Sequence, residues 1–136
     1  MQNATSKVYS EISERFPEIR SRFSEGDEEL AYLLMGYLAD WLKELRKEAL
    51  TPEIINRVIM FTRWCEEQPR GKDAGDDVLT IFTVGFFEAL FDSETTRAIL
   101  PKITTRDDIV TNADYLRTWV GGVNYDKALK LYAPKA

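Results

Sequence analysis

The sequence contains no histidine, and this absence removes most of the side-chain chemistry that enzymes use near neutral pH. Imidazole general bases, histidine-assisted nucleophiles, most zinc sites and the usual di-iron site of helical bundles depend on that residue. Cys65 is the one thiol. It lies near the C-terminal end of an expected helix, where nothing activates a thiolate. We interpret Cys65 as a small buried hydrophobic residue and expect no enzyme activity.

Carboxylates are the remaining candidates for acid–base chemistry, and most of them come as adjacent pairs. Neighbouring residues on a helix point about 100° apart, so such a pair does not easily share a metal or a substrate. Asp73 has better spacing with Asp76 and Asp77, and a Mg²⁺ site there is an alternative to ordinary helix capping. We expect the capping role, no metal and no cofactor. The adjacent pairs are Glu28/Glu29, Glu66/Glu67, Asp76/Asp77 and Asp107/Asp108.

One stretch of the chain contains acidic residues but no basic ones. No lysine or arginine lies between Lys72 and Arg97, whereas six acidic residues fall in that interval. Both ends of the apolar segment inside it therefore carry uncompensated charge, which either steers a basic protein partner or forms a solvated surface. We predict an exposed partner-binding face, consisting of Asp73, Asp76, Asp77, Asp92 and Glu94.

Helical periodicity dominates the segments that would position these groups. The first helix presents apolar residues at steps of three or four from Val8 to Phe23 and is expected to break near Phe16, because Pro17 follows. A second helix is expected over about residues 27–50. Thr51-Pro52-Glu53 then signals a third helix after a very short turn, which predicts an antiparallel hairpin.

The segment 77–91 is apolar around nearly its whole circumference, which predicts a buried central helix. Gly85 in its middle costs about 1 kcal/mol of helix propensity relative to alanine, so a neighbouring helix is expected to approach closely there. Beyond it the pattern weakens, with a break expected near residues 111–112. Side-chain caps are expected at Thr51, Ser93, Thr105 or Asp107, and Asn124.

Together these patterns predict an all-α fold, a single helical domain over residues 1–136. We expect an irregular bundle of about six or seven helices, arranged as successive antiparallel hairpins around the buried central helix. The aromatic residues divide between core and surface. Trp41 and Phe61 fall on core stripes, whereas Tyr115 and Trp119 are left open between core packing and exposed anchors.

Length, composition and charge agree with such a domain. The 136 residues, 44% of them hydrophobic and 30% charged, suit one globular domain. A net charge of −5 disfavours nucleic acid, whose phosphate backbone requires a basic face. The polar start of the chain and the single cysteine favour the cytoplasm, and no apolar run approaches the roughly 20 residues of a membrane span.

A family resemblance rests on a few short motifs. A helix followed by Phe16-Pro17-Glu18, a long amphipathic helix, and the apolar Phe86-Phe87-Glu88-Ala89-Leu90 resemble small bacterial all-helical proteins, some of them immunity proteins of toxin systems. The resemblance covers most of the chain in outline. It implies inhibition by binding, in which an acidic cytoplasmic protein occludes the active site of a toxin, and it assigns no binding residue.

The sequence therefore predicts a non-catalytic binding protein, an immunity protein that neutralises a cognate bacterial toxin by direct occlusion. The expected partner is a basic toxin domain. Two alternatives remain. One is a helical adaptor or regulatory subunit, and the other is an enzyme that acts through carboxylates and a divalent metal.

Overall fold

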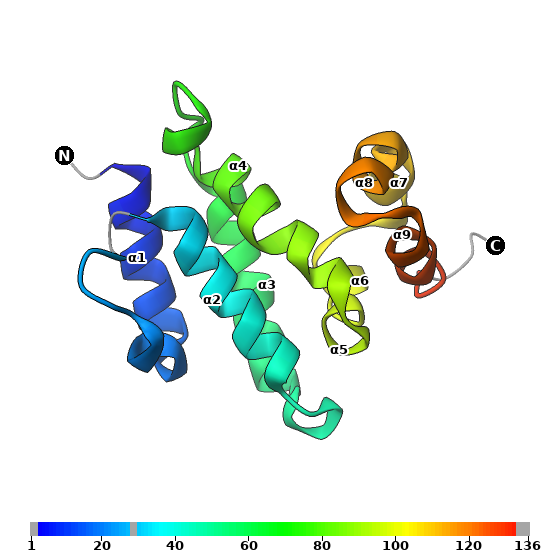
Figure 1. Cartoon of the computed structure of the whole chain (residues 1–136), viewed down its shortest axis with the longest axis horizontal. Helices are drawn as coiled ribbons and strands as arrows, with labels where there is room; N and C mark the ends of the chain where they lie inside the picture. The colour runs from blue at the N-terminus through cyan, green and yellow to red at the C-terminus, as the bar shows by residue number, and fades with distance from the viewer. Residues whose placement is uncertain (1–2, 28–29, 133–136) are drawn as a thin grey trace.

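Helices fill the part of the chain that the structure, a computed structural model, describes, namely residues 3–27 and 30–132 (Figure 1). Those ranges contain no strand, so the predicted all-α class is confirmed. They hold nine α-helices rather than six or seven, because the C-terminal third is divided into short pieces. The α-helices are α1 (Ala4–Arg15), α2 (Ala31–Glu44), α3 (Pro52–Glu67), α4 (Val78–Phe82), α5 (Glu94–Arg97), α6 (Leu100–Ile103), α7 (Arg106–Thr111), α8 (Ala113–Val120) and α9 (Gly122–Leu129).

Shorter helical segments connect several of these helices. The connecting segments are η1 (Pro17–Arg22), η3 (Lys47–Ala49), η4 (Ala74–Asp76), η5 (Thr83–Phe87) and η6 (Glu88–Asp92). Of these, η5 is a single π-helical turn and the others are 3₁₀ helices. Because α4, η5 and η6 follow one another without a gap, they form one continuous helical segment, residues 78–92.

The first helix ends near Phe16, as expected from Pro17. Phe16 caps α1 with its backbone N–H on the carbonyl of Ile12, and Pro17 begins η1 in the next position. This change of direction leaves the Phe16 ring fully buried, edge-on to Phe61 with ring centroids 5.9 Å apart. The break therefore contributes an aromatic residue to the core.

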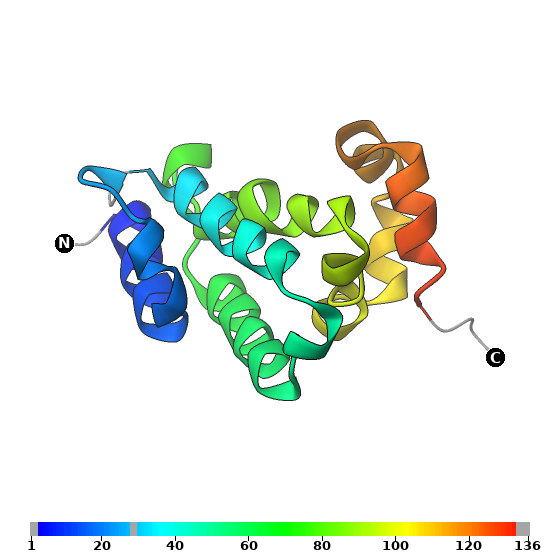
Figure 2. The same cartoon turned by 60° about the horizontal axis from the view of Figure 1, so that its bottom comes forward.

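Helices α1, α2 and α3 surround the first half of the central segment. Both α2 and α3 pack against α1 and α4, and the chain reverses between them through η3 (Figure 2). The second helix is shorter than the expected 27–50, since α2 begins at Ala31 and ends at Glu44. The start of α3 is as predicted, because the Thr51 side chain accepts a hydrogen bond from the backbone N–H of Ile54.

The segment 78–92 supplies the centre of the core. Phe82 and Phe86 pack against Phe61 with ring centroids 6.2 and 6.3 Å away. The predicted close approach at Gly85 is confirmed, because a Cβ there would lie 2.8 Å from the Cβ of Met35. The segment is not covered all round, however, and Val84 on its outer side is 45% exposed.

The C-terminal helices α7, α8 and α9 lie together at one end of the molecule, and α8 and α9 pack against η6 (Figures 1 and 2). The predicted caps at Ser93 and Thr105 are present, whereas the one at Asn124 is wrong. Gly121, with φ of 90°, is the N-cap residue of α9, and Asn124 lies inside that helix. A glycine adopts this left-handed conformation without strain, so it makes the turn between α8 and α9.

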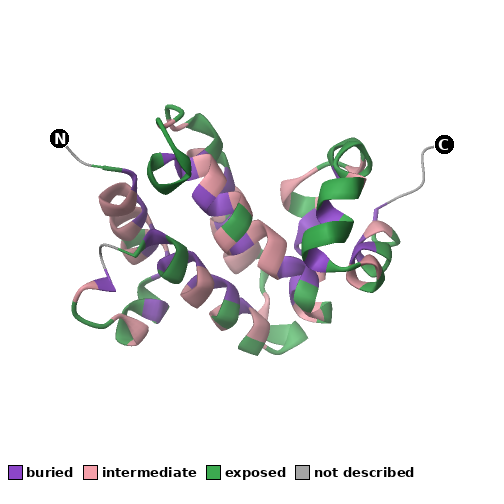
Figure 3. Ribbon diagram, turned by 45° about the horizontal axis from the view of Figure 1, so that its top comes forward, coloured by how far each residue is buried: buried purple, intermediate pink, exposed green. Residues whose placement is uncertain are grey.

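Buried residues follow the inner sides of the helices, as the purple ribbon in Figure 3 shows. Trp41 is half-buried and Phe61 fully buried, and both pack against the core as predicted. Among the described residues, no helix has the length and apolar character that crossing a bilayer requires.

Candidate functional site

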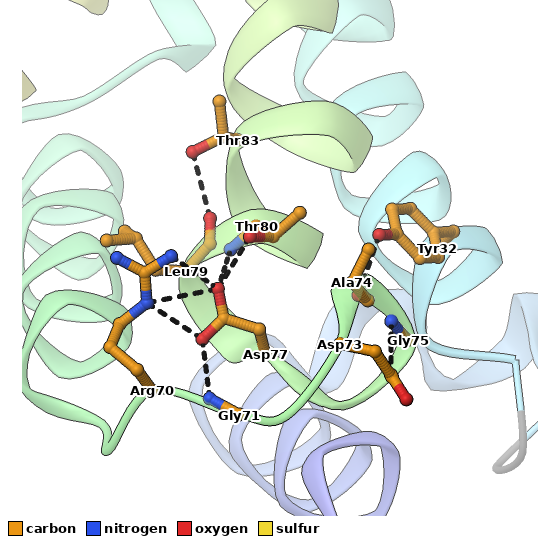
Figure 4. Close-up of polar contacts among 10 residues, drawn as sticks. All are labelled: Tyr32, Arg70, Gly71, Asp73, Ala74, Gly75, Asp77, Leu79, Thr80 and Thr83. Atoms are coloured by element: carbon orange, nitrogen blue, oxygen red, sulfur yellow. Dashed lines mark hydrogen bonds and ion pairs between the residues drawn. The ribbon is translucent and has the colours of Figure 1, made fainter.

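The predicted acidic face begins in the loop before α4, where one carboxylate holds the loop together (Figure 4). Asp77 accepts hydrogen bonds from Arg70 Nε at 2.9 Å and Nη2 at 2.8 Å, and from the backbone N–H of Gly71 at 2.9 Å. It also caps α4 by accepting from the backbone N–H of Thr80. Gly71 must be a glycine, since a Cβ would lie 1.8 Å from the carbonyl oxygen of Asp76.

This arrangement makes Asp77 a structural residue. Its side chain is buried, which corrects the expectation that it lies on an exposed face. The Arg70 guanidinium, with help from Thr80 and the Gly71 N–H, holds the pKa of Asp77 well below its usual range. A carboxylate with this many donors is not available to a protein partner.

The other two loop carboxylates are exposed but also make local contacts. Asp73 caps η4 by accepting from the backbone N–H of Gly75 at 3.0 Å. Asp76 accepts from the backbone N–H of Ala4 at 3.1 Å and so attaches the loop to the start of α1. On the other side, the Tyr32 hydroxyl of α2 donates to the carbonyl of Ala74 at 3.0 Å (Figure 4). The loop is thus fixed between α1 and α2.

The remaining predicted residues lie at the opposite end of the segment 78–92, next to bases from elsewhere in the chain. Asp92 forms an ion pair with Lys43 of α2, with Nζ and Oδ2 3.1 Å apart. Glu94 lines a hollow of about 520 Å³ together with Lys47, Arg97 and Lys127. The fold therefore splits the five residues into two groups and compensates much of the charge that the sequence leaves unpaired.

The described residues offer little for catalysis or metal binding. Cys65 is fully buried, and burial raises the pKa of its thiol, in line with the structural role expected for it. No group of three or more cysteine, aspartate or glutamate side chains gathers there in a way that could hold a metal ion. The pair Glu28/Glu29 lies outside the described residues.

The C-terminal helices also expose large apolar side chains to solvent. Trp119 is 66% exposed and Val123 is 69% exposed, and Tyr115 is 43% exposed. The rings of Tyr115 and Trp119 lie together, with centroids 6.2 Å apart. We call the ring pair Tyr115 and Trp119 the aromatic face, and Val123 near the start of α9 is a further exposed apolar residue. Because Tyr115 and Trp119 are exposed, core packing is excluded for both. Val123 carried no signal in the sequence beyond its residue type.

Beside the aromatic face, a cleft of about 360 Å³ opens between α3, the segment 78–92 and helices α7 and α8. We call it the interhelical cleft. Leu79, Phe82 and Phe87 contribute its apolar lining, and Tyr115 belongs both to the cleft and to the aromatic face. The π-helical turn η5 contributes Thr83 and Phe87, and such turns occur frequently at functional sites.

The charge in this cleft is negative. Glu66 of α3 and Asp108 of α7 line it, and among its described lining residues there is no lysine or arginine. At the rim, the Tyr115 hydroxyl donates to Glu88 Oε2 at 2.6 Å. This bond to the carboxylate, with burial, raises the pKa of Tyr115 to about 12. Sequence spacing could not reveal that Glu66 and Asp108 line the same cleft, because only the tertiary fold places α3 and α7 around it.

These features define a small all-helical domain with an aromatic face and an acidic cleft. Residues 9–106 match the model of a domain of unknown function, DUF7674, and the chain belongs to that family. No curated protein and no solved structure matches the chain. The matched span ends at the start of α7, so it includes one side of the interhelical cleft and none of the aromatic face.

Proposed function

We propose that this chain is a non-catalytic binding protein that neutralises a basic toxin by docking on it through the aromatic face. The observation that carries the proposal is the exposed pair Tyr115 and Trp119, with Val123 beside it in sequence at the start of α9. Tryptophan and tyrosine are the residues most enriched among the energetic anchors of protein interfaces. A single exposed apolar residue is ordinary, but two aromatic rings in contact at the surface mark a candidate interface.

The helices behind this face are well supported, so the anchors are held in place. The buried hydroxyl of Tyr125 donates to the carbonyl of Ile109 at 3.1 Å and connects α9 with α7. Arg117 lies over the Tyr125 ring, 4.7 Å from its centroid, and pairs with Asp126. A rigid anchor loses little conformational entropy on binding, which favours affinity.

The charge of the partner follows from what borders the aromatic face. The interhelical cleft adjoins it through Tyr115 and carries Glu66 and Asp108 without a basic lining residue among those described. Opposite charge steers the encounter of two proteins and excludes partners of the same charge. A basic partner, as the sequence predicted, is therefore the complementary one, although the surface differs from the predicted acidic residues.

The test begins with the genes that adjoin this one in its genome. Each neighbouring product is expressed in bacteria alone and together with the chain, and growth is followed. We expect one product to stop growth and the chain to restore it. Affinity for that product is then measured at two salt concentrations, and it should fall as salt rises.

Three variants separate the candidate surfaces. Trp119→Ala should weaken binding by about 30-fold or more, as truncation of an interface anchor does, while the free energy of unfolding changes by less than about 0.5 kcal/mol. Leu33→Ala, a 40% exposed apolar residue of α2, is the matched control and should bind normally. Loss of binding only in the double reversal Asp73→Lys and Asp76→Lys would return the site to the loop before α4, which carries both residues. If no neighbouring product is toxic or bound, the proposed function is wrong.

A further inference from the structure

Three of the hydroxyl groups that line the interhelical cleft already use their protons within the protein. The Thr62 hydroxyl donates to the carbonyl of Val58 at 2.9 Å, and the Thr83 hydroxyl donates to the carbonyl of Leu79 at 2.8 Å. The Tyr115 hydroxyl donates to Glu88. Each of these three hydroxyl groups has one proton, which is engaged, so each offers a ligand only lone pairs.

The polar lining also includes Thr104, Asn112 and two carboxylates. Glu66 and Asp108 are both exposed, and neither side chain has a hydrogen bond or an ion pair with any residue in the described part of the chain. Ionised carboxylates are acceptors only. Arg63 and Lys102 do not line the cleft, but they line an adjoining hollow that shares Glu66 and Thr104 with it. The cleft therefore offers carboxylates and no basic lining residue among those described, which favours a ligand that brings donors and positive charge.

The rest of the cleft is apolar and aromatic. Phe82 and the half-buried Phe87 contribute rings, and Leu79, Ile103 and Leu116 contribute aliphatic surface. Ring faces attract cations, and aliphatic walls favour a hydrocarbon stem. A volume of about 360 Å³ lies within the range of small-molecule sites.

We propose that the interhelical cleft binds a small organic cation, an alkylammonium or alkylguanidinium group on an apolar stem. The stem lies against Leu79 and Phe87, and the cationic head donates to Glu66 and Asp108. This site adjoins the aromatic face and shares Tyr115 with it, but its test needs no toxin, so its failure and that of the proposed function can be told apart. The same head group occurs on free amines and on lysine side chains of proteins, so the experiment includes both.

Three probes with one stem and different heads test the chemistry directly. Hexylammonium, hexanol and hexanoate are titrated to about 10 mM, and binding is followed through the NMR signals of Leu79, Ile103, Phe87 and Leu116. Hexylammonium should bind with a Kd of about 0.1 to 1 mM, since so small a ligand gains little more. Hexanol and hexanoate should bind at least about tenfold more weakly, because neither supplies a cation.

Matched variants locate the head group. The double variant Glu66→Gln and Asp108→Asn should reduce hexylammonium binding to the level of hexanol. Glu67→Gln and Asp114→Asn, exposed neighbours on α3 and α8 that do not line the cleft, should leave it unchanged. Melting temperatures close to that of the wild type establish that the variants fold.

The last arm compares a free amine with a lysine side chain on a peptide unit, using N-acetyl-lysine amide. Binding as tight as that of hexylammonium assigns the cleft to a lysine of a protein partner, and binding of hexylammonium alone assigns it to a free amine. Either outcome supports a cation site. Equal binding of all three hexyl probes, no saturable shift with hexylammonium, or an unchanged affinity in the double variant would overturn the proposal.

Discussion

The helices around the segment 78–92 and the C-terminal helices use their apolar residues in different ways. Helix α2 has six buried residues, spread along its full length. Helix α8 has the stronger amphipathic pattern of the two, yet only Leu116 and Val120 in it are buried. Tyr115 and Trp119 on the same helix are exposed. An apolar stripe therefore predicts a helix, but it does not tell whether the stripe is buried in the core or stays exposed at the surface.

The largest effect is expected in the core region, at Phe86. This residue is fully buried and lies against Phe61 and Phe82. Phe86→Ala should lower the free energy of unfolding by about 3 to 5 kcal/mol, from lost burial and the cavity that remains. Urea unfolding followed by circular dichroism measures it, and a change below about 1 kcal/mol would contradict a central role for the segment 78–92.

A smaller effect on stability is expected at Asp77, where the loop before α4 meets the segment 78–92. Asp77→Ala removes the cap of α4 and the bonds from Arg70 and Gly71, and should cost about 2 to 3 kcal/mol. Asp92→Ala is the control, because its exposed ion pair with Lys43 is worth about 0.5 kcal/mol or less. Equal costs would show that the two ends of the segment do not differ.

Acid should reduce the difference in stability between wild type and Asp77→Ala. Its pKa is lowered in the folded chain, so its contribution is fully present above the unfolded value of about 3.9 and is lost as the pH falls below it. The gap in stability between wild type and Asp77→Ala should therefore be constant from pH 7 to about pH 5 and shrink in more acidic solution. A gap that widens with acid would contradict the assigned cause.

Much of the fold could be predicted because its signals are local. The break at Phe16 and the caps at Thr51 and Ser93 depend on residues within one helical turn of each other. The charge pattern could not be interpreted in that way. Lys43 reaches Asp92 only because α2 packs against η6, and the interval between Lys72 and Arg97 says nothing of that contact.

The candidate site was harder still to predict, for the same physical reason. Glu66 and Asp108 lie on helices far apart in the chain, and each looked like one member of an adjacent acidic pair. Tyr115 and Trp119 were visible as aromatic residues, but exposure is a property of the packed molecule. Residue type and spacing therefore supplied candidates, and tertiary packing decided among them.

The junction between the two regions gives the smallest effect and the most direct test of how they join. The Tyr115 hydroxyl of α8 donates to Glu88 of η6, and it is the one described side-chain hydrogen bond between these two elements. Burial raises the pKa of Glu88, and the bond from Tyr115 opposes that rise by stabilising the ionised carboxylate. Tyr115→Phe should therefore raise the pKa of Glu88 further, at a cost of about 1 kcal/mol in stability, since the tyrosine is partly exposed. An NMR titration of the Glu88 carboxyl carbon measures the shift.

Tyr32→Phe, which loses the hydrogen bond from its hydroxyl to the Ala74 carbonyl instead, is the control and should leave the pKa of Glu88 unchanged. An unchanged or lowered pKa in Tyr115→Phe would mean that this hydrogen bond does not form in solution, and the junction of α8 with η6 would then depend on packing alone.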